Sequence, residues 1–386
     1  MTLVCSPLLA LHIYLLYLNN LYCQIFRKYT QNMLHETAQL IQYLNRIYDP
    51  NTMAMVDFLP PLVSNPENLP VSIPSLIDQI NNQKTDTVLI NYTYDRRCPE
   101  SLYDLLADQT NKKLIILTSN YKFFRKKHKA IVYLNYYFFD LIQSWKRYEI
   151  EQLRPKLMSC LNKNLWTHRI INFLNLEKQP WYNQCLVSFG WNVNDSISLG
   201  LDKSIIELQS IITDEEISRL KQLQLPIMFE DIIQARSVYY NGKSIAHQDC
   251  YIDYVLENGN FLSTESSCKQ HMLHMYFITE KIWKPLLSGQ FFFLFGPQGL
   301  IDHLEDLGID TYKDIIDHSY DHWDSIDIRI HSLRIIDSID KLIKQGIEHA
   351  WVDTTERRKK NIEYLYSEEF KNILLLDLKE KLIEFS

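Results

Sequence analysis

Short, continuous runs of apolar residues recur in the first part of the chain, at 87–93, 113–118 and 130–134. Helix-length segments separate these runs, and one of them begins at Cys98-Pro99-Glu100. Runs without polar alternation are typical of buried strands in a parallel sheet, and the segments between them are then crossover helices. The pattern predicts a small α/β domain that ends near residue 150.

Two segments precede these predicted strands. Residues 33–48 have the apolar spacing of a helix. Residues 49–74 are rich in proline and turn-forming residues, which predicts a loop or linker.

The α/β pattern starts again after residue 150. It predicts strands at 156–162, 184–190, 260–265 and 290–295, and helices at 166–176, 214–223, from 279 and at 299–307. Gly296-Pro297 ends the last of these strands, and the chain is mainly helical from 324 onward. These elements predict a second α/β domain.

The chain of 386 residues is long enough for two such domains rather than one core. We therefore expect an α/β fold of two Rossmann-like domains facing across a cleft. The predicted boundaries are an extension at 1–32, an N-terminal domain at 33–150, a C-terminal domain at 151–340 and terminal helices at 341–386.

Composition narrows the class of protein. An apolar share of 46% and a charged share of 23% are ordinary for a globular protein. The net charge of −7 provides no basic field for a nucleic-acid backbone, so nucleic acid is not expected as a partner. The seven scattered cysteines favour thiols in a reducing compartment, which predicts a cytoplasmic protein.

Residues 3–26 form an apolar stretch that is followed by Arg27 and Lys28. Polar residues such as Asn19 and Asn20 interrupt it, and each is costly in hydrocarbon. Three interpretations stay open: a membrane anchor giving weak membrane association, an added helix, or a start codon placed too early.

The segment around Thr279-Glu280-Lys281 is the most informative for chemistry. Thr279 can cap a helix whose first turn holds Glu280 and Lys281, and free N–H groups at such an end attract anions. Glu280 can accept hydrogen bonds from two ribose hydroxyls, while Lys281 and the helix end neutralise a pyrophosphate. A nucleoside diphosphate has both features.

Three further residues are candidates for the same ligand. Asn162 ends a predicted strand, and Arg169 stands early in the next predicted helix, where doubly wound sheets bind ligands. Arg169 can hold phosphates bidentately, which is the favoured role; capping its own helix or pairing with Glu177 are the alternatives. Glu265 closes another predicted strand and is as consistent with a surface position as with the site.

These motifs resemble a known family. The series Leu161-Asn162, His168-Arg169, Ser263-Thr264-Glu265-Ser266, Phe277-Ile-Thr-Glu-Lys and Leu307-Gly-Ile-Asp-Thr-Tyr is similar to glycosyltransferase-like proteins of phages and marine microbes, which in turn resemble the α1,3-fucosyltransferases. The resemblance covers roughly residues 156–330. It departs from the family at Gln290-Phe291-Phe292, where a small residue or proline is expected, and in the whole N-terminal half.

The resemblance implies a GT-B-type glycosyltransferase that transfers a sugar from a nucleotide-diphosphate sugar with inversion. It implies that Arg169 and Lys281 bind the donor pyrophosphate, that Glu280 binds the ribose, and that no metal or other cofactor belongs to the donor site. The C-terminal domain would then bind the nucleotide sugar, and the N-terminal domain a glycan or other hydroxyl acceptor. A catalytically inactive carbohydrate- or nucleotide-binding protein of the same fold is the alternative.

An inverting transfer needs a general base within about 3 Å of the acceptor hydroxyl. Asp95 and Glu100 follow the predicted strand at 87–93, so they are the candidates by position. Tyr320 and Arg329 lie in the region of resemblance, and their roles stay open.

Other patterns have ordinary explanations. Cys268, His271 and His274 are zinc-ligand types, but their spacing spreads around a helix, so surface side chains are expected. The acidic run Asp321, Asp324 and Asp327 is interpreted as a solvated helix face. The aromatic run 133–139 is either core, which is favoured, or a platform for sugar stacking.

Overall fold

The protein is described here by a computed structural model. It describes residues 53–57, 69–91, 103–104, 106–118, 120–122, 131–133, 138–139, 141–142, 145, 148–162, 165–190, 197–225, 227, 245–256, 275–296, 298–322, 327–376 and 378–380. The chain divides into an N-terminal unit, Met1–Asn91 with Leu106–Ile115, and a C-terminal unit, Tyr92–Leu105 with Ile116–Ser386. The fold is mixed α/β with parallel sheets.

The first sheet has the strand order β1-β2-β3-β5. Its strands are β1 (Met53–Asp57), β2 (Thr87–Asn91), β3 (Lys113–Thr118) and β5 (Ile131–Tyr133). The pairs β1–β2 and β3–β5 are parallel. The continuous apolar runs predicted β2, β3 and β5 as parallel strands, whereas β1 was not predicted. The predicted helix at 33–48 lies outside the described residues.

The prediction of a loop over 49–74 is wrong for residues 53–57 and 69–74, and the rest of this stretch lies outside the described residues. This stretch contains β1 and the start of helix α2 (Leu69–Asn81), which has Pro74 in its interior. An interior proline removes one helical hydrogen bond. The helix forms nevertheless, because Leu76 and Ile80, four residues apart on one face, are buried.

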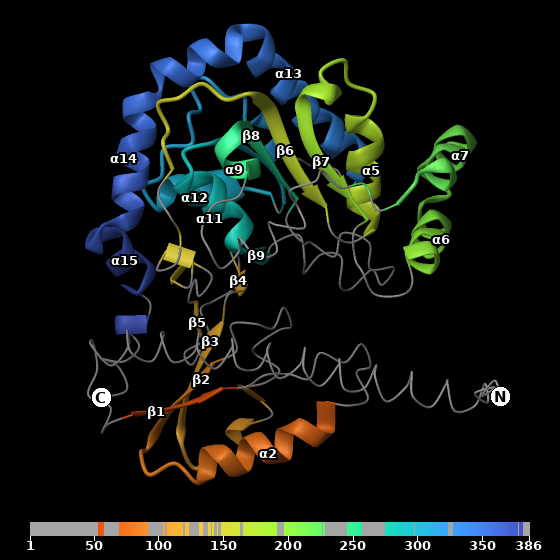
Figure 1. The fold of residues 1–386 in the computed structure, drawn as a ribbon. Coiled ribbons are helices and arrows are strands. Elements are labelled where there is room, and N and C mark those ends of the chain that lie inside the picture. Colours follow the sequence, from red (N-terminus) through yellow and green to blue (C-terminus); the bar gives the residue numbers. More distant parts are fainter. Residues whose placement is uncertain are drawn as a thin grey trace, which may run out of the picture. The chain divides into compact units, whose positions relative to one another are not determined.

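The second sheet, entirely within the C-terminal unit, has the order β10-β8-β6-β7, and all its pairs are parallel. Its strands are β6 (Lys156–Asn162), β7 (Cys185–Phe189), β8 (Cys250–Leu256) and β10 (Phe291–Phe295), as Figure 1 shows. The chain adds β7 on one side of β6, and β8 and then β10 on the other. The strand order therefore reverses between β6 and β8.

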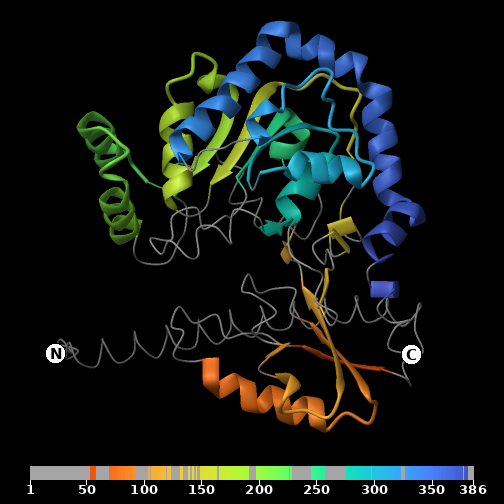
Figure 2. The same cartoon turned by 180° about the vertical axis from the view of Figure 1, so that it is seen from behind.

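Helices cover both faces of this sheet (Figures 1 and 2). The neighbouring residues Asp253 and Tyr254 of β8 point to opposite faces, as successive strand residues must. Asp253 faces His247 of α9 (Ile245–Asp249), on the side of α11 (Glu280–Leu287). The hydroxyl of Tyr254 bonds Asn172 of α5 (Thr167–Leu176), on the side of α13 (Ile328–Asp353). Burial on both faces explains why these strands are almost continuously apolar.

The remaining elements of the C-terminal unit lie around this sheet. They are α6 (Ile197–Leu208), α7 (Asp214–Gln222), α12 (Leu300–Asp306), α14 (Thr355–Tyr366), α15 (Glu368–Leu374), the short helices η2 (Tyr182–Gln184) and η3 (Ser319–Asp321), and the antiparallel pair β4 (Asn120–Lys122) and β9 (Met275–Phe277). Among the described residues, no helix is long and apolar enough to cross a membrane. Residues 3–26 lie outside them.

Part of the aromatic run 133–139 belongs to the core. Phe138 and Phe139 are buried, and the ring of Phe138 lies 5.0 Å from the ring of Trp283 and 5.0 Å from that of Phe370. The prediction of core is confirmed for these two residues. The burial of Tyr136 and Tyr137 lies outside the description.

Candidate functional site at the carboxyl edge of the second sheet

Two helices begin at the same edge of the second sheet. Helix α5 begins at Thr167, five residues after β6 ends at Asn162. Helix α11 precedes β10, which runs parallel to β8, so α11 runs back against the strands and begins at their carboxyl ends. The two helix N-termini lie on opposite faces of the sheet, and the reversal of strand order lies between β6 and β8. Ligands of doubly wound sheets bind at this position.

The start of α11 has the predicted cap. Thr279 is buried, and its Oγ1 accepts the backbone N–H of Lys281 with 3.4 Å between the two atoms. Glu280 follows in the first turn and is partly buried. Burial acts to raise the pKa of Glu280, but the ammonium groups of Lys281 and Lys284 bring it below its ordinary value. Glu280 is therefore a carboxylate at neutral pH, able to accept hydrogen bonds from a ligand.

The end of β6 places the other predicted pair. Asn162 is completely buried, and its backbone N–H donates to Oγ of Ser188 at 3.1 Å. Arg169 lies in the first turn of α5, buried, with its guanidinium 5.1 Å from the ring centre of Trp166. Glu177, the ion-pair partner considered for Arg169, is bound by Arg219 at 3.0 Å.

The structure thus places Thr279, Glu280 and Lys281 at the start of α11, and Asn162 and Arg169 at the junction of β6 and α5. Three other predicted site residues, Asp95, Glu100 and Glu265, lie outside the described residues, as do Cys268, His271 and His274. Within the described part of the chain, no group of three or more His, Cys, Asp or Glu side chains is placed to hold a metal ion.

Beneath α11 lies a buried polar cluster that sequence reasoning did not find. Asp253 of β8 accepts a hydrogen bond from Oγ of Ser159 at 2.9 Å, and its other oxygen lies 3.7 Å from Nδ1 of His247. Burial raises the pKa of Asp253 to about 7 and lowers that of His247 to about 3. One signal was available in the sequence, because Asp253 is the only charged residue within the apolar run 250–256.

Gln290, a departure from the family pattern, completes this cluster. Its amide Nε2 donates to the carbonyl oxygens of Ala246 and Cys250 at 3.1 and 3.0 Å. Its Oε1 lies 2.9 Å from Nδ1 of His247 and must accept from it, so neutral His247 has its proton on Nδ1. The glutamine side chain therefore connects the start of β10 to α9 and to the start of β8.

The interpretation of the acidic run as a solvated face is wrong for Asp321. This residue is buried, and its Oδ2 accepts the backbone N–H of Ile301 at 2.9 Å, at the start of α12. Burial raises the pKa of Asp321 to about 7. Asp327 is exposed but caps α13, accepting the N–H groups of Arg329 and Ile330. Asp324 lies outside the described residues.

Several residues in the region of resemblance have structural roles. Arg329 binds both oxygens of Glu216 at 3.0 and 2.7 Å. The hydroxyl of Tyr320 accepts the N–H of Leu294 at 3.4 Å and lies 2.8 Å from Nδ1 of His318. These contacts account for the positions of both side chains, although Nε of Arg329 is buried without a hydrogen-bond partner among the described residues.

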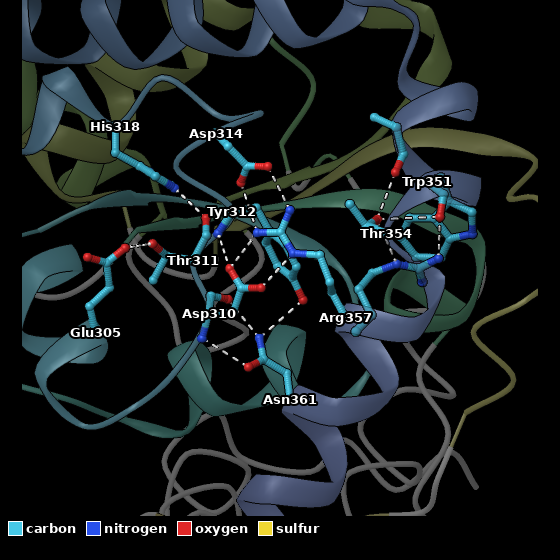
Figure 3. A network of polar contacts seen from close by, with 12 residues as sticks. Glu305, Asp310, Thr311, Tyr312, Asp314, His318, Trp351, Thr354, Arg357 and Asn361 are labelled. Atoms are coloured by element: carbon cyan, nitrogen blue, oxygen red, sulfur yellow. Dashed lines mark hydrogen bonds and ion pairs between the residues drawn. The ribbon is translucent and has the colours of Figure 1, made fainter.

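The segment 305–318, which contains the Leu307-Gly-Ile-Asp-Thr-Tyr motif, is held by α14 (Figure 3). Arg357 donates to both Asp310 and Asp314, at 2.7 to 2.8 Å. Asn361 donates to the Tyr312 hydroxyl at 3.1 Å. Tyr312 has a left-handed backbone with φ of 61°, a costly conformation for a bulky residue that these contacts stabilise. The residues of this motif therefore have a structural role in the fold.

Comparisons of the chain with protein-family models, curated proteins and solved structures find no match. Any function is therefore argued from the site itself.

Proposed function

We propose that the chain is a glycosyltransferase that uses a nucleotide-diphosphate sugar as donor and binds it at the carboxyl edge of the second sheet. One observation supports this most strongly: the Thr279 cap presents an ionised Glu280 beside Lys281 at a helix N-terminus on the edge where the strand order reverses. A carboxylate for ribose hydroxyls next to cationic groups for phosphates matches a nucleoside diphosphate. The two-domain GT-B architecture is part of the same proposal.

The proposed reaction is a displacement at the anomeric carbon of the donor sugar. The acceptor hydroxyl oxygen forms the new bond as the bond to the diphosphate breaks, and the hydroxyl proton passes to a general base, for which Asp95 and Glu100 are the candidates. Negative charge grows on the leaving diphosphate. Arg169, Lys281 and the N-terminus of α11 stabilise it, and preorganised groups of this kind supply a large part of many catalytic rate enhancements.

Nucleotide binding tests the donor site directly. Purified protein is heated with UDP, GDP or CDP and with their sugar conjugates, and the melting temperature is compared with that of Lys281→Ala. At about 100 times its dissociation constant a ligand stabilises the fold by about 2.7 kcal/mol, which is a readily visible shift. We expect one nucleotide to raise the melting temperature of the wild type and to raise that of Lys281→Ala much less.

Lys221→Ala is the matched control, because Lys221 is an exposed lysine at the end of α7. It should retain the full ligand shift. A shift equal in the wild type and in Lys281→Ala would refute the assignment of Lys281. Release of the nucleoside diphosphate from the stabilising donor then separates a transferase, which turns it over, from a binding protein, which does not.

A further inference from the structure

Asn162 stands beside the place where the topology puts a ligand. It is the last residue of β6, and β6 borders the reversal of strand order. Its side chain is completely buried. A buried amide at this edge can have a structural role, in which it stabilises the fold, or it can contact the bound ligand.

The hydrogen bonds of Asn162 leave one side-chain atom unused. Nδ2 lies 3.3 Å from Sγ of Cys160, whereas Oδ1 is buried and accepts no hydrogen bond from the described part of the chain. A buried acceptor without a partner destabilises the folded state, because it has lost its hydrogen bonds to water and forms none within the protein. Native proteins seldom keep such an atom unless a water, an ion or a ligand completes it.

Asn172 shows how the same unit treats an asparagine that serves the fold. It is equally buried, and its Nδ2 donates to the carbonyl oxygen of His168 at 2.7 Å. Its Oδ1 accepts from the hydroxyls of Ser332, at 2.8 Å, and Tyr254. Every polar atom of this amide is satisfied, so the unused acceptor of Asn162 is not a general feature of buried asparagines in this unit.

The start of α5 provides the anion-binding part of the same site. Its N-cap residue Trp166 makes no side-chain cap, and Arg169 lies in the first turn. Helix N-termini of this kind bind phosphates. A phosphate held there would bring a neighbouring part of the ligand to the end of β6, where the unused acceptor of Asn162 lies.

We infer that Oδ1 of Asn162 accepts a hydrogen bond from a hydroxyl group of the bound nucleotide sugar, and that Asn162 thereby selects ligands with a hydroxyl beside the diphosphate. The inference rests on the proposed function and adds the group on the ligand that this residue recognises. Either the ribose or the transferred sugar can supply the hydroxyl.

Melting of the ligand-free protein gives the first test. Asn162→Leu has nearly the same shape and removes the unused acceptor, so it should melt at the wild-type temperature or above it. Asn172→Leu is the matched control, and it should melt several degrees lower because it leaves Tyr254 and Ser332 without their acceptor. If Asn162→Leu folded but were destabilised as much as the control, Asn162 would be structural and the inference would be overturned.

Ligand titration gives the second test. Wild type and Asn162→Leu are titrated with UDP, GDP and CDP and with the hexose conjugate of each. We expect the variant to bind about 3- to 10-fold more weakly, the loss that corresponds to one neutral hydrogen bond. A loss already seen with the plain diphosphate assigns the ribose hydroxyl, and a loss confined to the conjugate assigns the sugar. If Asn162→Leu did not fold, Asn162→Ala, which adds no atoms, would replace it in the titration.

The remaining outcomes are distinct. Equal affinity of wild type and variant overturns the inference about Asn162 and leaves the proposed donor site standing. If none of the six compounds binds the wild type, the proposed function itself fails and the inference fails with it.

Discussion

Arg358 of α14 and Asn162 of β6 are both completely buried polar residues of the C-terminal unit, yet their surroundings differ. The guanidinium of Arg358 donates to the carbonyl oxygens of Ile150, Gly289 and Trp351, and lies 3.5 Å from the ring centre of Trp351. Asn162 keeps an acceptor that no described residue satisfies. A polar group saturated by the protein serves the fold, whereas one left incomplete at the carboxyl edge of a parallel sheet has capacity for a ligand.

The largest expected effect is a loss of stability on replacing Arg358, whose hydrogen bonds are all made within the protein. Arg358→Met leaves several buried carbonyl oxygens without a donor and should lower the free energy of unfolding by roughly 3 kcal/mol or more. Denaturant titration measures the loss. Arg357→Met, in a partly exposed ion-pair network, should cost clearly less. A loss at Arg358 no greater than at Arg357 would contradict the distinction.

A second, smaller effect is expected on nucleotide binding when Glu280 of the proposed donor site is replaced. Glu280→Gln removes a charged acceptor at the start of α11, so we expect nucleotide binding to weaken by about 1.5–3 kcal/mol, the range for hydrogen bonds to charged groups. Calorimetric titration with the stabilising nucleotide measures it. The matched control is Glu215→Gln, an exposed glutamate in the first turn of α7, which should bind as the wild type does. Unchanged affinity in Glu280→Gln would remove Glu280 from the site.

The smallest expected effect concerns the buried cluster beneath α11. Burial raises the pKa of Asp253 to about 7, above its unfolded value, so the folded protein keeps a proton that the unfolded chain releases. The stabilisation from this proton is complete below about pH 4 and is lost as the pH rises through about 7. The variant Asp253→Asn has an amide at this position, which does not titrate.

The stability of the wild type relative to Asp253→Asn should therefore fall by roughly 1 kcal/mol between about pH 6 and pH 8. Urea unfolding of both proteins at the two pH values measures the change, and subtracting the variant removes the contributions of other titrating groups, such as buried His247 and His318. No change between the two pH values would instead mean that Asp253 is ionised in the folded protein throughout, with the ammonium of Lys284 favouring its charge.

Local patterns were sufficient for many of the elements. Continuous apolar runs located β2, β3, β6, β7 and β10, because a strand buried on both faces leaves that record in the sequence. Thr279 located the start of α11, because a side-chain cap is a local interaction between residues that are close in sequence. The fold class and part of the candidate site followed from these elements.

The failures also have physical reasons. The prolines suggested a loop where β1 and α2 form, because burial of Leu76 and Ile80 is a tertiary effect that no local rule includes. Strand β8 was not predicted, since Asp253 interrupts its apolar run. The partners that make a buried carboxyl acceptable there are Ser159, which is distant in sequence, and His247, which lies in the preceding helix α9.

The sequence by itself determined the α/β class, most strands and helices of the C-terminal unit, and the residue types at the start of α11. Only the tertiary structure decided that β8 pairs with β6, and hence where the strand order reverses and which strand ends border a ligand. It also decided which buried polar groups are satisfied. Hydrogen-bond partners such as Arg358 and Ile150 are separated by about half the chain, and long-range pairing of this kind leaves no periodic trace in the sequence.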